Sequence, residues 1–453
     1  MLHVALSLAE LSLLERLKRQ YDNNRAPDER LLRYYQGTQR IEQLGMAIPP
    51  TMRRFLTVIN WPRVVVDTRE SRQKLRGLIL PGEDAVDPQL RSIMDASNMT
   101  AHLKMFNRDR LIFGRAFLSA GTNEANQSLP LGRVESPREM AAIVDVRREA
   151  MTAAARFYGV DETTNIGPTN VTLYLPDETI WIERRGNGKW FEVDRDKHML
   201  GAVPIVMHLN RRMSSGWTGY SELSDIIPLT DSAARTMTNL QFAVEAHGIP
   251  RIWMTGVAQG DFVDKNGNPV PKWEAYYNAI HTLTKADAKI GQLSGADLKN
   301  FETAMRMYGT QAATVTGFPA RYFGITTTNP SSADGIDAEE VELVQRAESD
   351  NIEVGMTIGW FGALLLRLAT GEWTEGNRVT ADWFDPSTPT VAQRTDALVK
   401  IRQAGTISRE GLWDELGWSE ARKSRERGYL EKEAAEGLDV LKLGGPAGDV
   451  AIG

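Results

Sequence analysis

The sequence contains no cysteine, and this absence excludes several kinds of site at once. A chain of 453 residues without this residue type has no disulfide, no thiolate metal site and no cysteine nucleophile. We therefore expect the protein to work in a reducing cytoplasm or in a particle built there. The six histidines have no partners at metal-ligand spacing, so we expect neither a metal site nor a cofactor.

Long apolar runs and a dominant positive charge are also missing. No stretch approaches the roughly 20 consecutive apolar residues that a membrane span needs, and the first residues lack the basic region of a signal peptide. We therefore expect no membrane partner. The formal net charge of -6 argues against tight wrapping of nucleic acid, because neutralising phosphates requires clustered Lys and Arg. It leaves open a surface past which DNA slides.

Catalytic motifs are absent as well. No Walker-type phosphate loop is present, and residues 186–189 lie between two predicted strands, where a hairpin turn is expected. Glu339 and Glu340 open a predicted helix, where carboxylates commonly stabilise the N-terminal end of the helix dipole. The basic pairs are short, and we expect solvated faces or ion pairs for residues 147–148, 184–185 and 211–212. The sequence therefore predicts a protein that is not an enzyme.

What is present predicts an α+β protein. With 42% hydrophobic residues, the chain can bury a core and form roughly two to four structural units. Apolar spacing predicts helices over residues 9–23, 28–37, 223–248, 297–315, 338–368, 391–404, 408–416 and 419–436, with Asp28 as a cap after Pro27. Alternation predicts strands over residues 171–176, 179–193, 204–210 and 378–385. Pro62 and three consecutive valines favour an extended or tightly buried segment over residues 59–67.

The centre of the chain has an unusual order of segments. Two predicted helices flank an insertion over residues 249–293 that is rich in turns, and the second helix runs into residues 316–324, Thr-Gly-Phe-Pro-Ala-Arg-Tyr-Phe-Gly. A polar loop follows residue 324, and a long predicted helix then begins at Ala338. The loop joins two helices without any catalytic constellation, which suits a segment that touches something repetitive without gripping it.

These segments, taken in order, resemble the portal proteins of tailed bacteriophages, in particular the portal family of long-tailed phages of Gram-positive hosts. The resemblance covers roughly residues 10–430, and it rests on the order of its motifs more than on any one of them. The motifs are Tyr34-Tyr-Gln-Gly with Leu44-Gly45, residues 60–67, Ser136-Pro-Arg-Glu, Gly216-Trp-Thr-Gly-Tyr-Ser-Glu-Leu, Glu245-Ala-His-Gly-Ile-Pro-Arg and residues 316–324.

The resemblance implies a ring-forming portal fold of about twelve subunits at one capsid vertex. Its parts would be a mixed α/β wing (residues 1–218), a first stem helix (219–247), a small β-containing clip (248–295), a second stem helix (296–317), a tunnel loop (318–337), a long wing helix with a returning strand (338–387), and crown helices with a tail (388–453). Such a ring would be assembled in the host cytoplasm and would remain in the virion.

The resemblance also implies partners and contact residues. Double-stranded DNA would pass through without sequence-specific contacts, and the terminase large subunit and then the head-tail adaptor would dock at the clip. The major capsid protein and a scaffolding protein would surround the ring. The expected DNA-channel residues of the tunnel loop are Thr326, Thr327, Thr328, Asn329, Ser331, Ser332 and Asp334. Lys299 and Arg306 would line the channel or pair between subunits, and the expected docking residues of the clip are Asp264, Lys265, Asn266 and Asn268.

Two alternatives stay open at this point. A DNA-packaging enzyme would need a nucleotide loop or an acidic metal cluster, which the sequence does not contain. Another ring-shaped head-tail connector, such as an adaptor, would normally be far shorter and would lack the helix-insertion-helix arrangement. The sequence therefore favours a portal that conducts DNA.

Overall fold

The computed structural model describes most of the chain, which its internal contacts divide into two compact units. Unit 1 comprises residues 1–330 and 339–386, and unit 2 comprises residues 331–338 and 387–453. The described residues are 5–39, 57–160, 167–185, 188–248, 252–256, 287, 289–292, 298–325, 333–374, 378–387 and 391–443.

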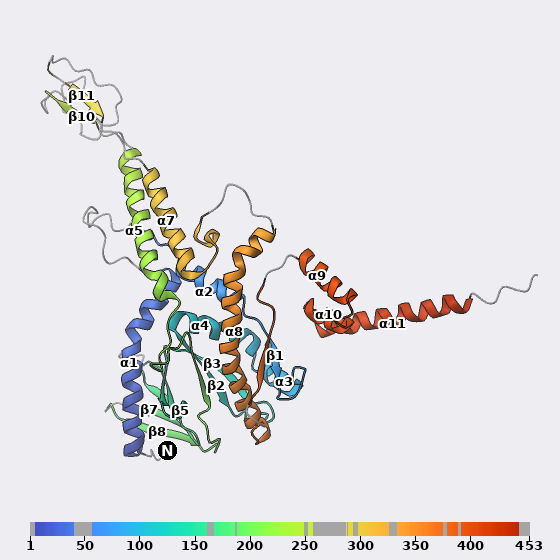
Figure 1. Ribbon diagram of the computed structural model, residues 1–453. Coiled ribbons are helices and arrows are strands. Elements are labelled where there is room, and N and C mark those ends of the chain that lie inside the picture. The colour runs from blue at the N-terminus through green and yellow to red at the C-terminus, as the bar shows by residue number, and fades with distance from the viewer. Residues whose placement is uncertain are drawn as a thin grey trace, which may run out of the picture. The chain divides into compact units, whose positions relative to one another are not determined.

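Helices and strands mix in unit 1, as the sequence predicts (Figure 1). Its helices are α1 (Leu8–Gln36), α2 (Trp61–Ser71), α3 (Pro88–Ala96), α4 (Met99–Phe113), α5 (Leu223–Gly248), α7 (Lys299–Thr316), the 3-10 helix η3 (Ala320–Phe323) and most of α8 (Ala333–Thr370). Its strands are β1 (Leu75–Ile79), β2 (Arg115–Gly121), β3 (Leu131–Glu135), β4 (Met140–Asp145), β5 (Ala150–Tyr158), β6 (Asn170–Tyr174), β7 (Thr179–Arg184), β8 (Trp190–Asp196), β9 (Ile205–Leu209), β10 (Ile252–Thr255), β11 (Lys289–Gln292) and β12 (Thr380–Trp383).

The strands form antiparallel sheets. A five-stranded meander has the order β4-β5-β6-β7-β8, and a three-stranded sheet has the order β3-β2-β9. Two further pairs join β1 to β12 and β10 to β11. The strands predicted around residues 171–176, 179–193, 204–210 and 378–385 are confirmed as β6, β7 with β8, β9 and β12. Gly188, in the predicted hairpin turn, has a left-handed φ of 77°.

The first helix corrects one prediction. Two helices were expected to meet at Pro27, with Asp28 as a cap, but α1 runs through both segments. Its N-terminus is a capping box formed by Ser7 and Glu10. The Asp28 side chain is buried and lies 2.6 Å from the guanidinium of Arg115 on β2. This ion pair and the packing of the helix on both sides of Pro27 outweigh the local cost of a proline inside a helix.

Residues 59–67 correct a second prediction made from the sequence. The extended alternative is wrong, because residues 61–71 form α2, with Pro62 in the first turn of the helix, where its missing N–H removes no hydrogen bond. The buried alternative is confirmed, since Val65 and Val66 lie in a core beside α4, the start of α5 and the end of α7. The valines therefore follow burial and not strand propensity.

The helix α8 packs along one side of the three-stranded sheet. Its apolar side chains, including Val354, Ile358 and Phe361, meet Ala116, Leu118 and Val206 of β2 and β9 in one core. By length and composition alone, the segment Ala338–Thr370 could span a membrane, but more than half of its apolar window is buried within the protein. This burial accounts for its composition. Gly371 follows the helix with a left-handed φ of 79°.

Unit 2 contains the end of the chain. Its helices α9 (Val391–Gln403), α10 (Arg409–Glu415) and α11 (Glu420–Leu443) confirm the three predicted helices, although the last is longer than expected. Trp413 and Trp418 stack with ring centroids 5.5 Å apart, and Glu410 and Arg427 form an ion pair at 2.8 Å. These contacts tie α10 to α11.

Candidate functional site

The helices α5 and α7 form an extended pair that leads from the core of unit 1 to the β10-β11 pair (Figure 1). The predicted helices over 223–248 and 297–315 are thereby confirmed, and the predicted insertion contains two described strands. The base of the pair is buried, where Leu223, Ile226 and Ala233 of α5 share a core with Ala312 of α7. The small residues Gly309 and Ala312 on the buried side of α7 permit close packing.

The exposed face of α7 carries the two cations singled out by the sequence. Lys299 and Arg306 lie seven residues apart and therefore share a helix face, and both are exposed. The Arg306 guanidinium lies 3.8 Å from the carboxylate of Glu302, one turn earlier. This local pairing weakens the attraction of Arg306 for a passing phosphate.

Threonines complete the same part of α7. The hydroxyls of Thr303, Thr310 and Thr314 each donate to the backbone carbonyl four residues earlier, at 2.9 to 3.1 Å. Side chains bonded in this way present little donor capacity to solvent. The exposed face is therefore polar but holds few groups that would grip an anion.

The segment after α7 is a packed turn and not an open loop. Gly317 ends the helix with a left-handed φ of 68°, and the buried rings of Phe318 and Phe323 fix the following residues. Phe323 meets Trp61 of α2 edge to face, with ring centroids 5.6 Å apart. The predicted tunnel loop, residues 318–337, therefore starts too early, because the described part of it is anchored through Ile325.

The other end of this loop also differs from prediction. The helix α8 begins at Ala333, so Asp334 lies in its first turn and not in the loop. Glu339 and Glu340 consequently lie beyond the first turn. Arg321 pairs with both carboxylates, and Arg72 reaches Glu340 at 2.7 Å. The two glutamates thus tie η3 and α2 to α8, so the proposed role at a helix terminus is wrong.

A second set of charges is buried beneath this junction. Arg69 of α2 contacts Glu222 at 2.5 Å and Asp350 of α8 at 2.6 Å, and Arg110 of α4 contacts Asp350 at 3.2 Å and Asn210 at 2.7 Å. Asn210 in turn donates to Glu222, the residue before α5. We name these five residues the wing network. It joins the start of α5 to α8.

Burial governs the protonation of this region. Burial alone would raise the pKa of Asp350, but the cations of Arg110 and Arg69 outweigh it, so the pKa of Asp350 is lowered. Burial, reinforced by Arg110, lowers the pKa of His208 to about 3. The neutral His208 ring has Nδ1 2.9 Å from the hydroxyl of Thr357 on α8. Asp350 therefore stays ionised at neutral pH, while the neighbouring His208 is neutral.

Sequence reasoning missed this network, although one indication was available. Leu103, Phe106, Arg110 and Phe113 fall on one face of α4 by helical spacing, so Arg110 stands among apolar side chains. A cation on an apolar face needs a buried partner. Nothing in the sequence identified the partner, because Asp350 lies 240 residues further along the chain.

The remaining predicted contact residues cannot be compared with the structure. Residues 264–268 of the clip and residues 326–332 of the tunnel loop lie outside the described residues. Within the described part of the chain, no group of three or more His, Cys, Asp or Glu side chains could hold a metal ion.

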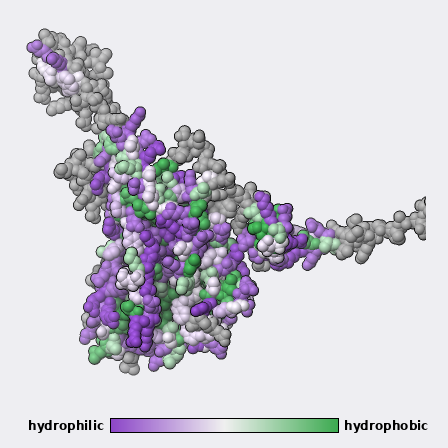
Figure 2. Space-filling model, in the orientation of Figure 1, coloured by the Kyte–Doolittle hydropathy of each residue, from purple (hydrophilic) through white to green (hydrophobic). Residues whose placement is uncertain are grey.

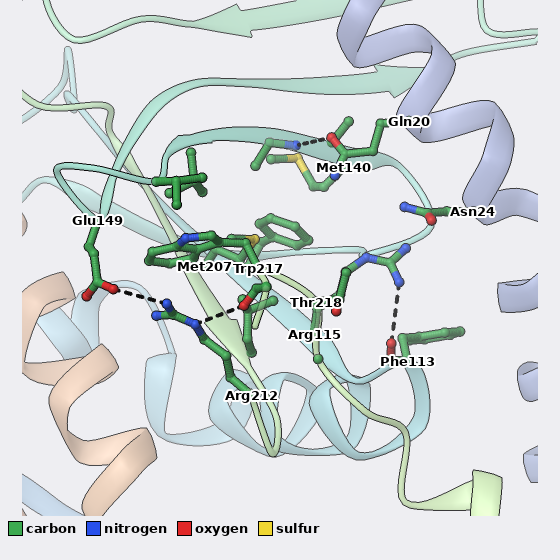
Figure 3. Close-up of a pocket in the computed structure, with 18 of the residues that line it drawn as sticks. Gln20, Asn24, Phe113, Arg115, Met140, Glu149, Met207, Arg212, Trp217 and Thr218 are labelled. Carbon is green, nitrogen blue, oxygen red and sulfur yellow. Dashed lines mark hydrogen bonds and ion pairs between the residues drawn. The ribbon is translucent and has the colours of Figure 1, made fainter. Parts of the chain in front are cut away.

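A pocket of about 460 Å³ opens elsewhere on unit 1, between α1, β4 and the segment that leads to α5 (Figure 3). Phe117, Met140 and Met207 contribute apolar walls, and Trp217 stands over the cavity. The guanidinium of Arg212 lies 3.6 Å from the centre of the Trp217 ring. Trp217 is partly buried against the pocket.

Comparisons with known proteins give a consistent result. A family model described as "Phage portal protein, SPP1 Gp6-like" matches residues 14–437. The portal proteins of Mycobacterium phages D29 and L5 are each 32% identical over 422 residues, which cover 90% of this chain and 86% of each relative.

Solved structures with a similar chain come from gene transfer agent particles. A chain in the neck of the native particle, computed with C12 symmetry, has a TM-score of 0.44 at 14% identity, covering 79% of this chain and 89% of that chain. A chain in the virion of the native particle has a TM-score of 0.44 at 15% identity, covering 83% and 96%.

Proposed function

The chain belongs to the family of SPP1 Gp6-like phage portal proteins, and from this membership we propose that it closes into a ring of about twelve subunits through which double-stranded DNA enters and leaves the capsid. A portal protein is a structural head-tail connector of the phage particle and not an enzyme, so family membership selects against both alternatives that the sequence left open. Closure of the ring would use a heterologous interface between neighbouring subunits.

The polar face of α7 is the observation that carries the DNA-conducting part of the proposal. A channel wall must exclude tight phosphate contacts, because each released counterion strengthens binding and slows movement. On this face Arg306 is paired with Glu302, and the threonine hydroxyls are bonded to the helix backbone. Such a surface lets DNA pass.

The tunnel loop is proposed to form the narrowest part of the channel. Its expected contact residues are small and polar from Thr326 to Ser332, and a described element stands at each end. Phe323 is buried at one end, and α8 begins at Ala333 at the other. Twelve copies of a short polar segment held in this way would make a rim around DNA that binds no particular sequence.

The clip is proposed to dock the terminase large subunit during packaging and the head-tail adaptor afterwards. Its place in the chain supports this, since it is inserted between the two helices that project from the core of unit 1. Substitution of Asp264, Lys265, Asn266 and Asn268 together by alanine should lower terminase binding without preventing ring formation. Unchanged binding of terminase to the variant ring would show that terminase docks at another part of the ring.

Electron microscopy of the purified chain tests the proposal as a whole. We expect closed rings with a central hole, and no ATPase or nuclease activity in the same sample. Monodisperse monomers that hydrolyse ATP or cut DNA would overturn it. Mass photometry of the same preparation gives the number of subunits in each ring.

A further inference from the structure

The outward face of α8 exposes large apolar side chains that nothing in the described part of unit 1 covers. Ile352 and Met356 are 70% and 75% exposed, and they lie one helical turn apart. Val341 lies on the same side and is half exposed. Single exposed apolar residues are common, but a helical pair of them on a rigid core helix marks a contact surface.

Carboxylates flank this pair. Glu348 and Glu353 are exposed, and neither forms an ion pair within the described part of the chain. We name Glu348, Ile352, Glu353 and Met356 the outer strip of α8. Its character is apolar and acidic, so a matching surface should be apolar at its centre and basic at its rim.

The pocket of Figure 3 offers apolar side chains and nearby cations. Its lining mixes the apolar side chains of Phe117, Met140, Met207 and Trp217 with polar ones, and its volume is about 460 Å³. Val146 lines it from the tip of the β4-β5 hairpin and is 73% exposed. Arg212 and Glu149 line the pocket, and the exposed Arg147, Arg148 and Arg211 lie next to lining residues or to Arg212 in sequence, so cations outnumber carboxylates at the rim.

Arg148 is the most loosely held of these rim cations, whereas Arg211 also lies 3.7 Å from the buried Glu222 and Arg212 packs on the Trp217 ring. Arg148 contacts Asp145 at 3.9 Å, and Arg212 contacts the exposed carboxylate of Glu149 at 3.2 Å. Arg211 contacts Asp225 at 3.2 Å. Exposed pairs of this kind exchange partners readily, because each contributes little free energy. The rim can therefore receive carboxylates from another surface.

The two surfaces lie on opposite sides of one sheet. Along β2, Ala116 and Leu118 face the core that contains α8, whereas Phe117 points to the other side and lines the pocket together with Met207 of β9. The outer strip faces away from this sheet on α8, because Val354 and Ile358 occupy the buried side of the helix. One copy of unit 1 therefore cannot place its own strip in its own pocket.

We propose that the outer strip of α8 docks into the pocket of a second copy of this chain. Met356 and Ile352 would enter the cavity and contact its apolar side chains beside Trp217, and Glu348 and Glu353 would meet Arg147 and Arg148 at the rim. The contact joins two different faces, so it repeats from copy to copy and can close a ring. The inference rests on the proposed ring and adds the residues that hold neighbouring subunits together.

The absence of cysteine makes a direct test available. A variant carrying both M356C and V146C should, on oxidation, give a ladder of cross-linked species that extends to the full ring on non-reducing gels. The matched control pairs M356C with V193C, an exposed position on β8, the strand at the other end of the sheet from β4. The control should give at least tenfold less cross-linking.

Each outcome distinguishes this inference from the proposed function. Rings that form normally but do not cross-link through the first pair would overturn the docking inference and leave the ring intact. A cross-link confined to single chains would show that another part of the same chain covers the strip, which also overturns it. Absence of rings from the unmodified chain would remove both proposals.

Charge reversal gives an independent test that does not use cysteine. The variant E348R/E353R should raise the concentration needed for ring formation at least tenfold, because like charges would then face each other at the rim. Adding R147E/R148E should restore assembly to within about threefold of the original chain. Circular dichroism checks that the variants fold, and an unchanged assembly concentration in E348R/E353R would contradict the proposed contact.

Discussion

The wing network and the exposed face of α7 both contain arginines and carboxylates, yet these charges have different consequences. In the wing network, Arg69, Arg110 and Asp350 are largely buried, and their partners lie on elements far apart in sequence. On α7, Arg306 and Glu302 are exposed and one turn apart. Buried charges must be paired to be tolerated, whereas exposed pairs contribute little to stability. The same residue types therefore fix the fold in one region and shape a surface in the other.

This difference between buried and exposed charges also shows which residues can be substituted without loss of stability. On the face of the molecule shown in Figure 2, hydrophilic surface predominates over unit 1 and separate hydrophobic patches interrupt it. A surface of this kind can change without unfolding the protein. The charged residues of the wing network cannot be changed in this way, because removal of one of them leaves an uncompensated buried charge.

The substitution R110M should lower the stability of the protein more than the other variants proposed below. It removes the cation that holds Asp350 and Asn210, and we expect the free energy of unfolding to fall by about 3 to 5 kcal/mol. Urea denaturation followed by tryptophan fluorescence measures this. The matched control R306M should change it by less than about 0.5 kcal/mol. Equal effects of the two substitutions would contradict the distinction between the regions.

Asp109 on α4 provides a buried carboxylate outside the network. Burial raises its pKa from 3.8 to about 7, and Arg108 only partly offsets this. Because the folded-state pKa is raised, its contribution to stability is complete below pH 4 and is lost as the pH rises through 7. We expect D109N to stabilise the protein at pH 8 by on the order of 2 kcal/mol, since solvent contact reduces the full effect.

Thermal unfolding of D109N and the original chain at several pH values checks this prediction. The difference in Tm should grow between pH 4 and pH 7 and stay level above pH 7. A difference that does not vary with pH would show that Asp109 is not held in a raised-pKa environment.

The junction between η3 and α8 should give an intermediate effect. Arg321 is partly exposed, and it bridges Glu339 and Glu340. We expect R321A to lower the free energy of unfolding by about 1 kcal/mol and to raise amide exchange at the start of α8. The control R346A removes only a pair within one helix, with Glu342, and should leave exchange in η3 unchanged. Equal exchange in both variants would mean that Arg321 does not anchor the loop.

The smallest effect on stability is expected for K299E/R306E. Both side chains are exposed, so the free energy of unfolding should change by less than about 0.5 kcal/mol. Packaging should nevertheless suffer, because these cations are proposed to line the channel or to pair between subunits. The amount of DNA packaged in infected cells measures this, with T303A, which removes a surface hydroxyl on the same face, as the control. Ring formation and packaging that both stay normal in K299E/R306E would remove the proposed role.

Much of the fold follows from local pattern, and the exceptions have physical causes. Period and turn residues predicted α5, α7, β6 to β9 and β12, because their helical spacing or alternation is visible in the local sequence. The break at Pro27 and the extended alternative for residues 59–67 failed because tertiary contacts outweighed local preference. Asp28 pairs with Arg115, and Val65 and Val66 are buried among helices.

The site was predicted less completely than the fold. The order of segments indicated the stem and the loop, since that order depends only on local patterns. The attachment of the loop did not follow from any local pattern, because Arg321, Glu340 and Arg72 meet across three separate elements. The wing network escaped prediction for the same reason. Pairings at large sequence separation leave little trace in one sequence.

A single-particle reconstruction of the assembled chain tests the central claim most directly. The account predicts a closed ring in which residues 326–334 are the part of each subunit nearest the axis, while Arg69, Arg110 and Asp350 lie away from it. A ring whose channel is lined by other residues, with residues 326–334 on its outer surface, would contradict the account.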